Sequence, residues 1–134
     1  FLPKNLVPTL SFAVVLIALG VFLLKPSESL GTYDGTLSVY YPLSHRWYET
    51  GRGDISADRL LRAEGEGVLL TLEDGSCIAL SFGTYVEVSR THVTLYRGKI
   101  MADVEPRPAD RPFRVLTPTA EICVVGTRFS VTVE

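Results

Sequence analysis

The stretch GVLLTLEDGSCIAL, from Gly67 to Leu80, decides the fold. On either side of Glu73-Asp74-Gly75 its apolar residues recur at every second position, which is typical of β-strands with one buried face. Asp-Gly between two such runs is a strong hairpin signal. The sequence therefore predicts two antiparallel strands, over 68–72 and 76–80, joined by a tight turn.

The same two-residue period continues to the end of the chain. It predicts further strands over 84–89, 93–96, 99–104, 113–117, 121–125 and 128–133. Turn residues separate these strands, and the proline-rich segment 105–112 is expected to be an extended loop. Short strands at such even spacing indicate a small antiparallel β-sandwich or rolled-sheet domain over residues 67–134.

The N-terminal part of the chain has a different pattern. Residues Asn5 to Leu24 carry no charge, are bracketed by Lys4 and Lys25, and place apolar side chains on every face of a helix. About twenty helical residues span roughly 30 Å, the thickness of the hydrocarbon core of a bilayer. The run is too long for a signal peptide and has no small-residue cleavage site before Lys25. Residues 1–25 are therefore predicted to be a transmembrane anchor, and the fold class is mainly β with one N-terminal transmembrane helix.

Charge limits the partners of the domain. The 134 residues carry a formal net charge of −2, and every acidic residue follows position 25. A mildly acidic domain offers no basic surface for nucleic acid, so we expect no nucleic-acid partner, whereas membrane lipid is an expected partner of the apolar run. The two lysines that flank this run balance each other, so charge alone leaves the orientation of the anchor open.

Residues 26–66 are predicted to be a linker and an aromatic juxtamembrane segment. Residues 26–35 are rich in Ser, Gly and Pro, as linkers are. An edge strand is expected over 36–41, closed by Pro42. Asp54 is expected to cap a short helix over 55–63 that Gly65 ends.

Aromatic residues gather in this segment. Tyr40, Tyr41, Trp47 and Tyr48 are candidates for partner binding, because Tyr and Trp are enriched at protein interfaces and at the membrane–water interface. The alternative is that these side chains cover the base of the domain. Both interpretations stay open from the sequence.

Cys77 and Cys123 allow a single internal disulfide. Each is expected in a strand, on the face opposite its apolar neighbours. A bridge between adjacent strands is one interpretation, because exposed free thiols are uncommon outside the cytosol. Two unpaired cysteines, shielded by a loop or a partner, are the other.

Several pieces of the second half of the chain occur in the order, and at about the spacing, of the FecR domain. They are Leu72-Glu73-Asp74-Gly75-Ser76, Leu80, Tyr85-Val86-Glu87-Val88, Val93-Thr94-Leu95-Tyr96-Arg97-Gly98, Asp103-Val104, Arg111-Pro112-Phe113-Arg114-Val115 and Val125-Gly126-Thr127-Arg128-Phe129-Ser130-Val131. Over about residues 71–133 the chain thus resembles this family.

The resemblance implies an extracytoplasmic β-domain on a single-pass protein of a Gram-negative-type envelope, anchored in the inner membrane with its C-terminal domain in the periplasm. Members that resemble the family's namesake regulate sigma factors in response to an outer-membrane receptor. Asp74, Gly75, Gly126 and Thr127 match the family motif, and a structural role is expected for them. Gly75 would supply a positive φ in the hairpin, and Gly126 would permit a bend before Phe129 enters the core.

The sequence shows no catalytic or metal-binding pattern. Neither of its histidines, His45 and His92, lies at metal-ligand spacing from another candidate ligand. A nucleophile elbow and a phosphate-binding glycine loop are also missing from the sequence. We expect no enzyme activity, no cofactor and no metal.

Only a few residues precede the apolar run, too few to form a sigma-binding domain. We therefore expect a non-catalytic single-pass subunit whose helix packs beside other transmembrane helices and whose β-domain docks on the extracytoplasmic face of a larger membrane complex. The alternative is an anti-sigma-type signal transducer whose cytoplasmic segment is not part of this chain, with a sigma factor and an outer-membrane receptor as partners. A third class is an envelope adhesion or polysaccharide-binding module, for which Tyr85 and Tyr96 would supply exposed aromatic side chains.

Overall fold

The computed structural model describes residues 29–134, and all of its regular elements there are β-strands. The helix predicted at 5–24 lies outside the described residues. Within 29–134 the chain has no helix long and apolar enough to cross a membrane. The strands are β1 (Ser29–Tyr41), β2 (Arg46–Ser56), β3 (Leu60–Ala63), β4 (Val68–Leu72), β5 (Cys77–Leu80), β6 (Tyr85–Val88), β7 (His92–Asp103), β8 (Phe113–Leu116), β9 (Glu121–Val124) and β10 (Arg128–Val133).

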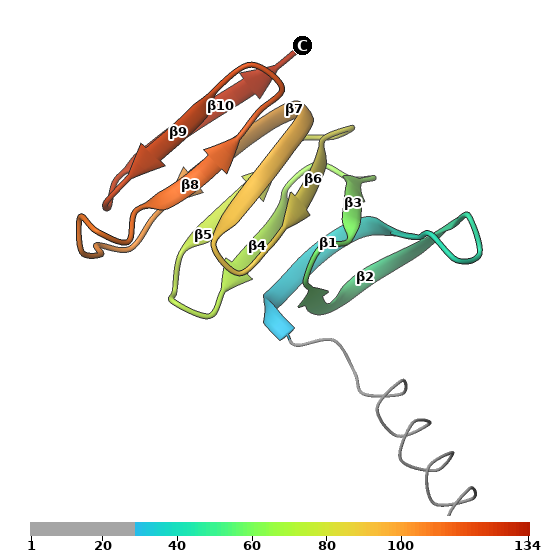
Figure 1. The fold of residues 1–134 in the computed structure, drawn as a ribbon. Coiled ribbons are helices and arrows are strands. Elements are labelled where there is room, and N and C mark those ends of the chain that lie inside the picture. The colour runs from blue at the N-terminus through green and yellow to red at the C-terminus, as the bar shows by residue number, and fades with distance from the viewer. Residues whose placement is uncertain (1–28) are drawn as a thin grey trace, which may run out of the picture.

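The strands form one hydrogen-bonded sheet that rolls up on itself (Figure 1). Pairings run from β5 through β4, β1, β3 and β6 to β7, and β7 pairs again with β5, so the sheet closes into a ring. β2 extends the sheet beyond β1, whereas β8, β9 and β10 extend it beyond β7. The prediction of a mainly β fold is confirmed. The sheet is mixed rather than purely antiparallel, because β8 runs parallel to β7.

Two long strands, β1 and β7, each change their pairing partner part-way along, so each belongs to both layers of the rolled sheet. The first half of β1 pairs with β4 and its second half with β3. In the same way, β7 pairs first with β6 and then with β5. The sequence predicted two strands here, over 93–96 and 99–104, separated by turn residues, and this prediction is wrong.

The change of partner in β7 occurs at Gly98. Its φ is 104°, and a Cβ there would lie 2.4 Å from Oγ1 of Thr84. The Thr84 hydroxyl accepts a hydrogen bond from the N–H of Lys99 and donates one to the carbonyl of the same residue, both at 3.1 Å. This side chain replaces a backbone partner at the bend, which explains why β7 continues through Gly98.

The core lies between the two layers of the ring. Its inward-facing side chains recur at every second position of each strand, as in Leu37 of β1 and Leu70 of β4. The largest fully buried side chains are Leu37, Ile55, Leu70, Ile78, Leu80, Leu95, Ile100, Val68, Val86, Val88, Val93 and Val115. The buried hydroxyls of Ser38, Ser76 and Thr84 all take part in hydrogen bonds, as buried polar groups generally do.

The region before Gly67 differs most from expectation. Residues 29–35, predicted to be linker, belong to β1, which is flanked by β2 on one side and by β3 and β4 on the other and so is no edge strand. The short helix predicted over 55–63 is also wrong. Ile55, Leu61 and Ala63 are buried within strand backbone, and Asp58 turns the chain between β2 and β3 with a φ of 59°.

Candidate functional site

The β1–β2 hairpin carries all four aromatic side chains that were predicted to bind a partner. Tyr40 lies directly opposite Trp47, with ring centroids 5.2 Å apart. The rings of Tyr41 and Tyr48 meet edge to face, with centroids 5.1 Å apart. Because successive residues of a strand point to opposite faces, the hairpin presents one aromatic pair on each face.

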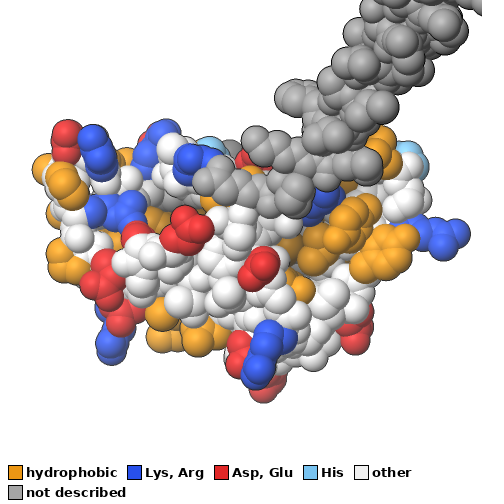
Figure 2. All heavy atoms as spheres, turned by 90° about the horizontal axis from the view of Figure 1, so that it is seen from below, with side chains coloured by type: hydrophobic (Ala, Val, Ile, Leu, Met, Phe, Trp, Pro, Cys, Tyr) orange, Lys and Arg blue, Asp and Glu red, His pale blue; other side chains and the backbone are white. Residues whose placement is uncertain are grey.

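The end of this hairpin is apolar and exposed. Leu43, in the turn between the strands, is fully exposed, and Tyr41 and Tyr48 beside it are 38% and 47% exposed. We call these three residues the hairpin tip. Figure 2 shows hydrophobic side chains gathered at the right-hand end of the molecule, where Figure 1 places this hairpin.

An arginine covers each aromatic pair. The Arg59 guanidinium lies 4.5 Å from the ring centre of Tyr41, and that of Arg62 lies 4.3 Å from the ring centre of Trp47. Trp47 also meets Tyr85 of β6 edge to face at 6.0 Å. Cation–π and aromatic contacts of this kind hold the rings in place. Tyr40, Trp47, Tyr85 and Arg62 are called the aromatic face below.

The sequence analysis missed these arginines as parts of the site and did not connect Tyr85 with the hairpin. No local pattern marks them, because strand pairing creates the contacts: β3 pairs with β1 on one side and with β6 on the other. Only the alternation of inward and outward residues in β3 could have placed Arg62 on the outer side.

The charge of Arg62 is neutralised within the aromatic face. Its guanidinium forms an ion pair with Glu64, which also accepts a 2.9 Å hydrogen bond from Ser38. The bonds from Arg62 and Ser38 lower the pKa of the Glu64 carboxyl. Bonds to Tyr85 and Glu64 raise the pKa of Arg62. Both groups therefore stay ionised at neutral pH, and their pairing holds the arginine that stacks on Trp47.

The turns around Asp74-Gly75 and Gly126-Thr127 hold a loop and do not line the hairpin. Asp74 accepts a 2.9 Å hydrogen bond from the N–H of Ser76 and forms an ion pair with Arg107. The backbone N–H of Arg107 donates a hydrogen bond to the carbonyl of Val125. The backbone N–H of Val104 donates one to the carbonyl of Thr127. The two turns thus fix the chain on both sides of Glu105.

The glycines of these turns have the expected conformation. Gly75 and Gly126 have φ values of 92° and 139°. A Cβ on Gly126 would lie 2.7 Å from Cα of Pro106. Phe129, three residues on, packs against the core and is partly buried.

Both cysteines are free thiols. Cys77 of β5 is half-buried and Cys123 of β9 is exposed. β5 pairs with β4 and β7, whereas β9 pairs with β8, so a bridge between adjacent strands is not formed.

Across residues 29–134, no group of three or more His, Cys, Asp or Glu side chains could hold a metal ion. His45 faces the Tyr40 hydroxyl at 3.2 Å, and His92 faces the Ser89 hydroxyl at 2.9 Å. What the hairpin offers instead is a fixed set of aromatic, apolar and guanidinium groups, the side chains enriched at protein interfaces.

Comparison with protein families matches residues 58–134 to the FecR protein family, which is more than half of the chain. The chain belongs to the FecR family. FecR domains are generally non-catalytic signalling or regulatory domains. No curated protein and no solved structure matches the chain.

The FecR match begins after β2, so both strands of the aromatic hairpin lie outside it. β1 is nevertheless part of the rolled FecR sheet, because it pairs with both β3 and β4. The aromatic face is therefore composite: Tyr40 and Trp47 come from the hairpin, and Arg62 and Tyr85 from the FecR-matched region.

Proposed function

We propose that this FecR-family protein is a non-catalytic, membrane-anchored subunit whose β-domain docks on a larger membrane complex through the hairpin tip and the aromatic face. The observation that carries the proposal is the hairpin tip, where the side chains of Tyr41, Leu43 and Tyr48 are exposed to solvent. Beside them, Arg59 stacks on Tyr41 and Arg62 stacks on Trp47. Family membership supports a regulatory or binding role over catalysis.

The energetics of such docking are favourable at this hairpin. Burial of apolar surface contributes about 25 cal/mol per Å², and aromatic residues and arginines supply most of the binding energy at many interfaces. Stacking on Trp47 and pairing with Glu64 already restrict Arg62. Little side-chain entropy is then lost on association, which favours affinity.

The apolar run at 5–24 supports the membrane part of the proposal. In this arrangement the anchor lies in the inner membrane beside other transmembrane helices, and the β-domain stands in the periplasm. The partner surface is the extracytoplasmic side of the same complex, and the subunit acts as a scaffold.

Family membership favours a second candidate, a transmembrane signal transducer of the anti-sigma type. In that case the β-domain would receive a signal from an outer-membrane receptor, and a cytoplasmic part would bind a sigma factor. The hairpin tip would then contact the receptor or the region around it.

The protein is tagged at its C-terminus in its own gene and purified from native membranes in mild detergent, and mass spectrometry of the co-purifying chains then separates the two candidates. Stoichiometric co-purification of integral membrane subunits supports the complex subunit. Co-purification of a sigma factor or an outer-membrane receptor supports the transducer. A protein that always runs as a free monomer contradicts both.

A further inference from the structure

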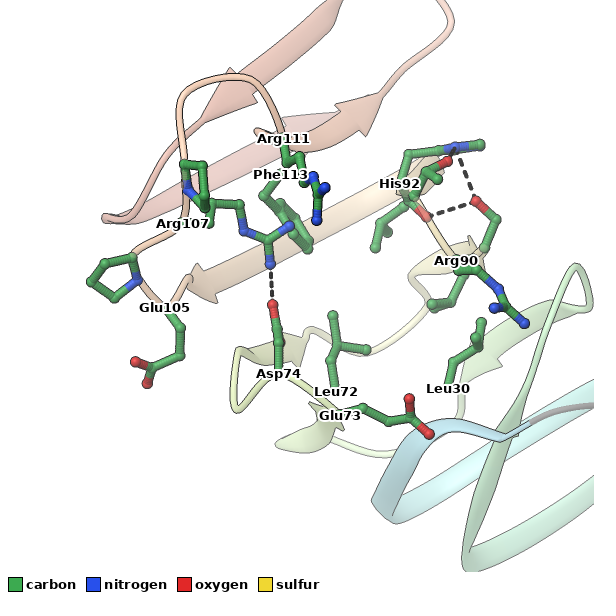
Figure 3. A pocket seen from close by; sticks show the side chains of 16 residues that line it. Leu30, Leu72, Glu73, Asp74, Arg90, His92, Glu105, Arg107, Arg111 and Phe113 are labelled. Atoms are coloured by element: carbon green, nitrogen blue, oxygen red, sulfur yellow. Dashed lines mark hydrogen bonds and ion pairs between the residues drawn. The ribbon is translucent and has the colours of Figure 1, made fainter.

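A cavity of about 370 Å³ lies apart from the hairpin, between the start of β1, the β4–β5 turn, the β6–β7 turn and the loop after β7 (Figure 3). Its apolar lining comes from Leu30, Leu72, Val88, Val93 and Phe113. Its polar lining includes Arg107 and Arg111, both from the loop. The proposed docking surface at the hairpin tip does not use this cavity.

Arg107 is fixed in the wall of the cavity. Its guanidinium forms an ion pair with Asp74 and lies 5.2 Å from the ring centre of Phe113. Its N–H donates a 2.9 Å hydrogen bond to the carbonyl of Val125. The two turns that clamp the loop therefore also set the position of this arginine.

One donor of Arg107 is left without an acceptor. Its Nε is buried and has no hydrogen-bond partner among the described residues. A buried donor without a partner is unfavourable, so a small movement of the Arg107 side chain that turns this N–H toward a ligand oxygen in the cavity would be stabilised.

Arg111 adds a second positive charge to the same wall. Its backbone N–H is bonded to the carbonyl of Pro108, but within residues 29–134 its guanidinium has neither a hydrogen bond nor an ion pair. In Figure 3 its side chain points down beside Phe113, on the same side of the cavity as Arg107. Asp74 thus neutralises only one of two neighbouring guanidinium groups.

The acidic residues around the cavity restrict the kind of anion. Glu73 and Asp74 line the side opposite Arg111, whereas the side chain of Glu105 points away from the cavity centre (Figure 3). These carboxylates repel a dianionic phosphate more than a singly charged carboxylate. The apolar lining then favours an anion that carries a hydrophobic group.

We propose that this cavity binds a carboxylate attached to a small apolar group. The carboxylate oxygens accept hydrogen bonds from Arg107 and Arg111, and the apolar group packs on Phe113 and Leu72. Such a ligand is either a free hydrophobic acid or the C-terminal residue of a peptide, which share this chemistry.

The test uses the full chain in mild detergent, titrated with N-acetyl-leucine and followed by NMR at the arginine Nε–Hε signals. Saturable shifts of the Arg107 signal are expected, with no effect of N-acetyl-leucinamide. Arg111→Gln should weaken binding about tenfold or more, because hydrogen bonds to charged groups contribute about 1.5–3 kcal/mol. The matched control Arg97→Gln, an exposed arginine outside the cavity, should leave binding unchanged.

A peptide that ends in leucine distinguishes the two sources. If it binds tighter than N-acetyl-leucine and loses this gain when amidated, the proposal holds for a peptide C-terminus. Equal binding supports a free acid. The proposal is overturned if the amide binds as well as the acid, if inorganic phosphate binds more tightly, or if Arg111→Gln has no effect. None of these outcomes depends on docking through the hairpin.

Discussion

The indole ring of Trp47 meets the ring of Tyr85 edge to face, with centroids 6.0 Å apart and planes at 88°. Trp47 belongs to a hairpin outside the FecR match, and Tyr85 to a strand inside it. This contact, together with the stacking of Arg62 on Trp47, attaches the hairpin to the domain. The aromatic face, one part of the surface proposed for docking, is therefore held by contacts with the rest of the fold.

Leu37→Ala tests whether β1 is an integral part of the FecR sheet. Leu37 is completely buried although it lies before the matched region. Loss of such a side chain leaves a cavity, so the free energy of unfolding should fall by about 2–5 kcal/mol in chemical denaturation. The control Leu43→Ala, at a fully exposed leucine, should stay within about 0.5 kcal/mol of the wild type. Equal stability of the two variants would show that β1 is not an integral part of the sheet.

Gly98→Ala tests the bend in β7. With a φ of 104° and a Cβ that would lie 2.4 Å from Oγ1 of Thr84, alanine is strained and clashes with its neighbour. We expect a loss of about 2 kcal/mol or more in thermal or chemical unfolding. Gly51→Ala in β2 meets nothing within 4 Å and should change stability little. A stable Gly98→Ala protein would show that β7 does not bend as described.

The lowered pKa of Glu64 makes part of the stability depend on pH. Because the folded state holds this pKa below the ordinary value of 4.5, the ionised carboxylate stabilises the fold above that pH. This contribution is lost as the pH falls through the pKa of the folded state. Glu64→Gln should therefore be less stable than the wild type by about 1 kcal/mol near neutral pH, and the difference should shrink in acid.

The control for this measurement is Glu66→Gln, at an exposed glutamate close by in the chain. Its unfolding free energy should stay close to that of the wild type near neutral pH. A difference between Glu64→Gln and wild type that stays constant with pH would show that the charge of Glu64 is not what stabilises the fold.

Trp47→Ala should weaken association with the partner complex by about 1–3 kcal/mol, because buried aromatic residues dominate many interfaces. The loss is measured as the fraction of complex that retains the subunit at a series of detergent-extract dilutions. Circular dichroism of the purified variant should still show a folded β-domain, since Leu37, Leu70 and the rest of the core are untouched. A fully assembled complex with this variant would refute the role of Trp47.

Much of the second half of the fold follows from local signals. The hairpin around Asp74-Gly75 and the last strand, β10, lie where the two-residue period places them, because one face of each strand packs on the core. β2 was missed because most of its side chains are exposed and only Ile55 is buried, so it lacks an alternating pattern. Local capping signals around Asp54 then suggested a helix, which strand pairing overrides.

The candidate site could be predicted only in part. The aromatic residues of the hairpin stand out in the sequence, but their contacts with Arg62 and Tyr85 depend on which strands pair. The clamp around Arg107 joins residues 33 positions apart, from Asp74 to Arg107. Contacts between residues so far apart in the chain produce no local sequence pattern, so only the structure reveals them.

The central claim is that the hairpin tip docks on a membrane complex. The most direct test is a pair of substitutions that each introduce a negative charge. Leu43→Asp places a carboxylate at the tip, and Phe82→Asp places one at another exposed apolar side chain, in the turn after β5. Neither residue is buried, so both variants should fold. Co-purification from native membranes should be lost for Leu43→Asp and retained for Phe82→Asp. Retention of the complex by Leu43→Asp would contradict the account.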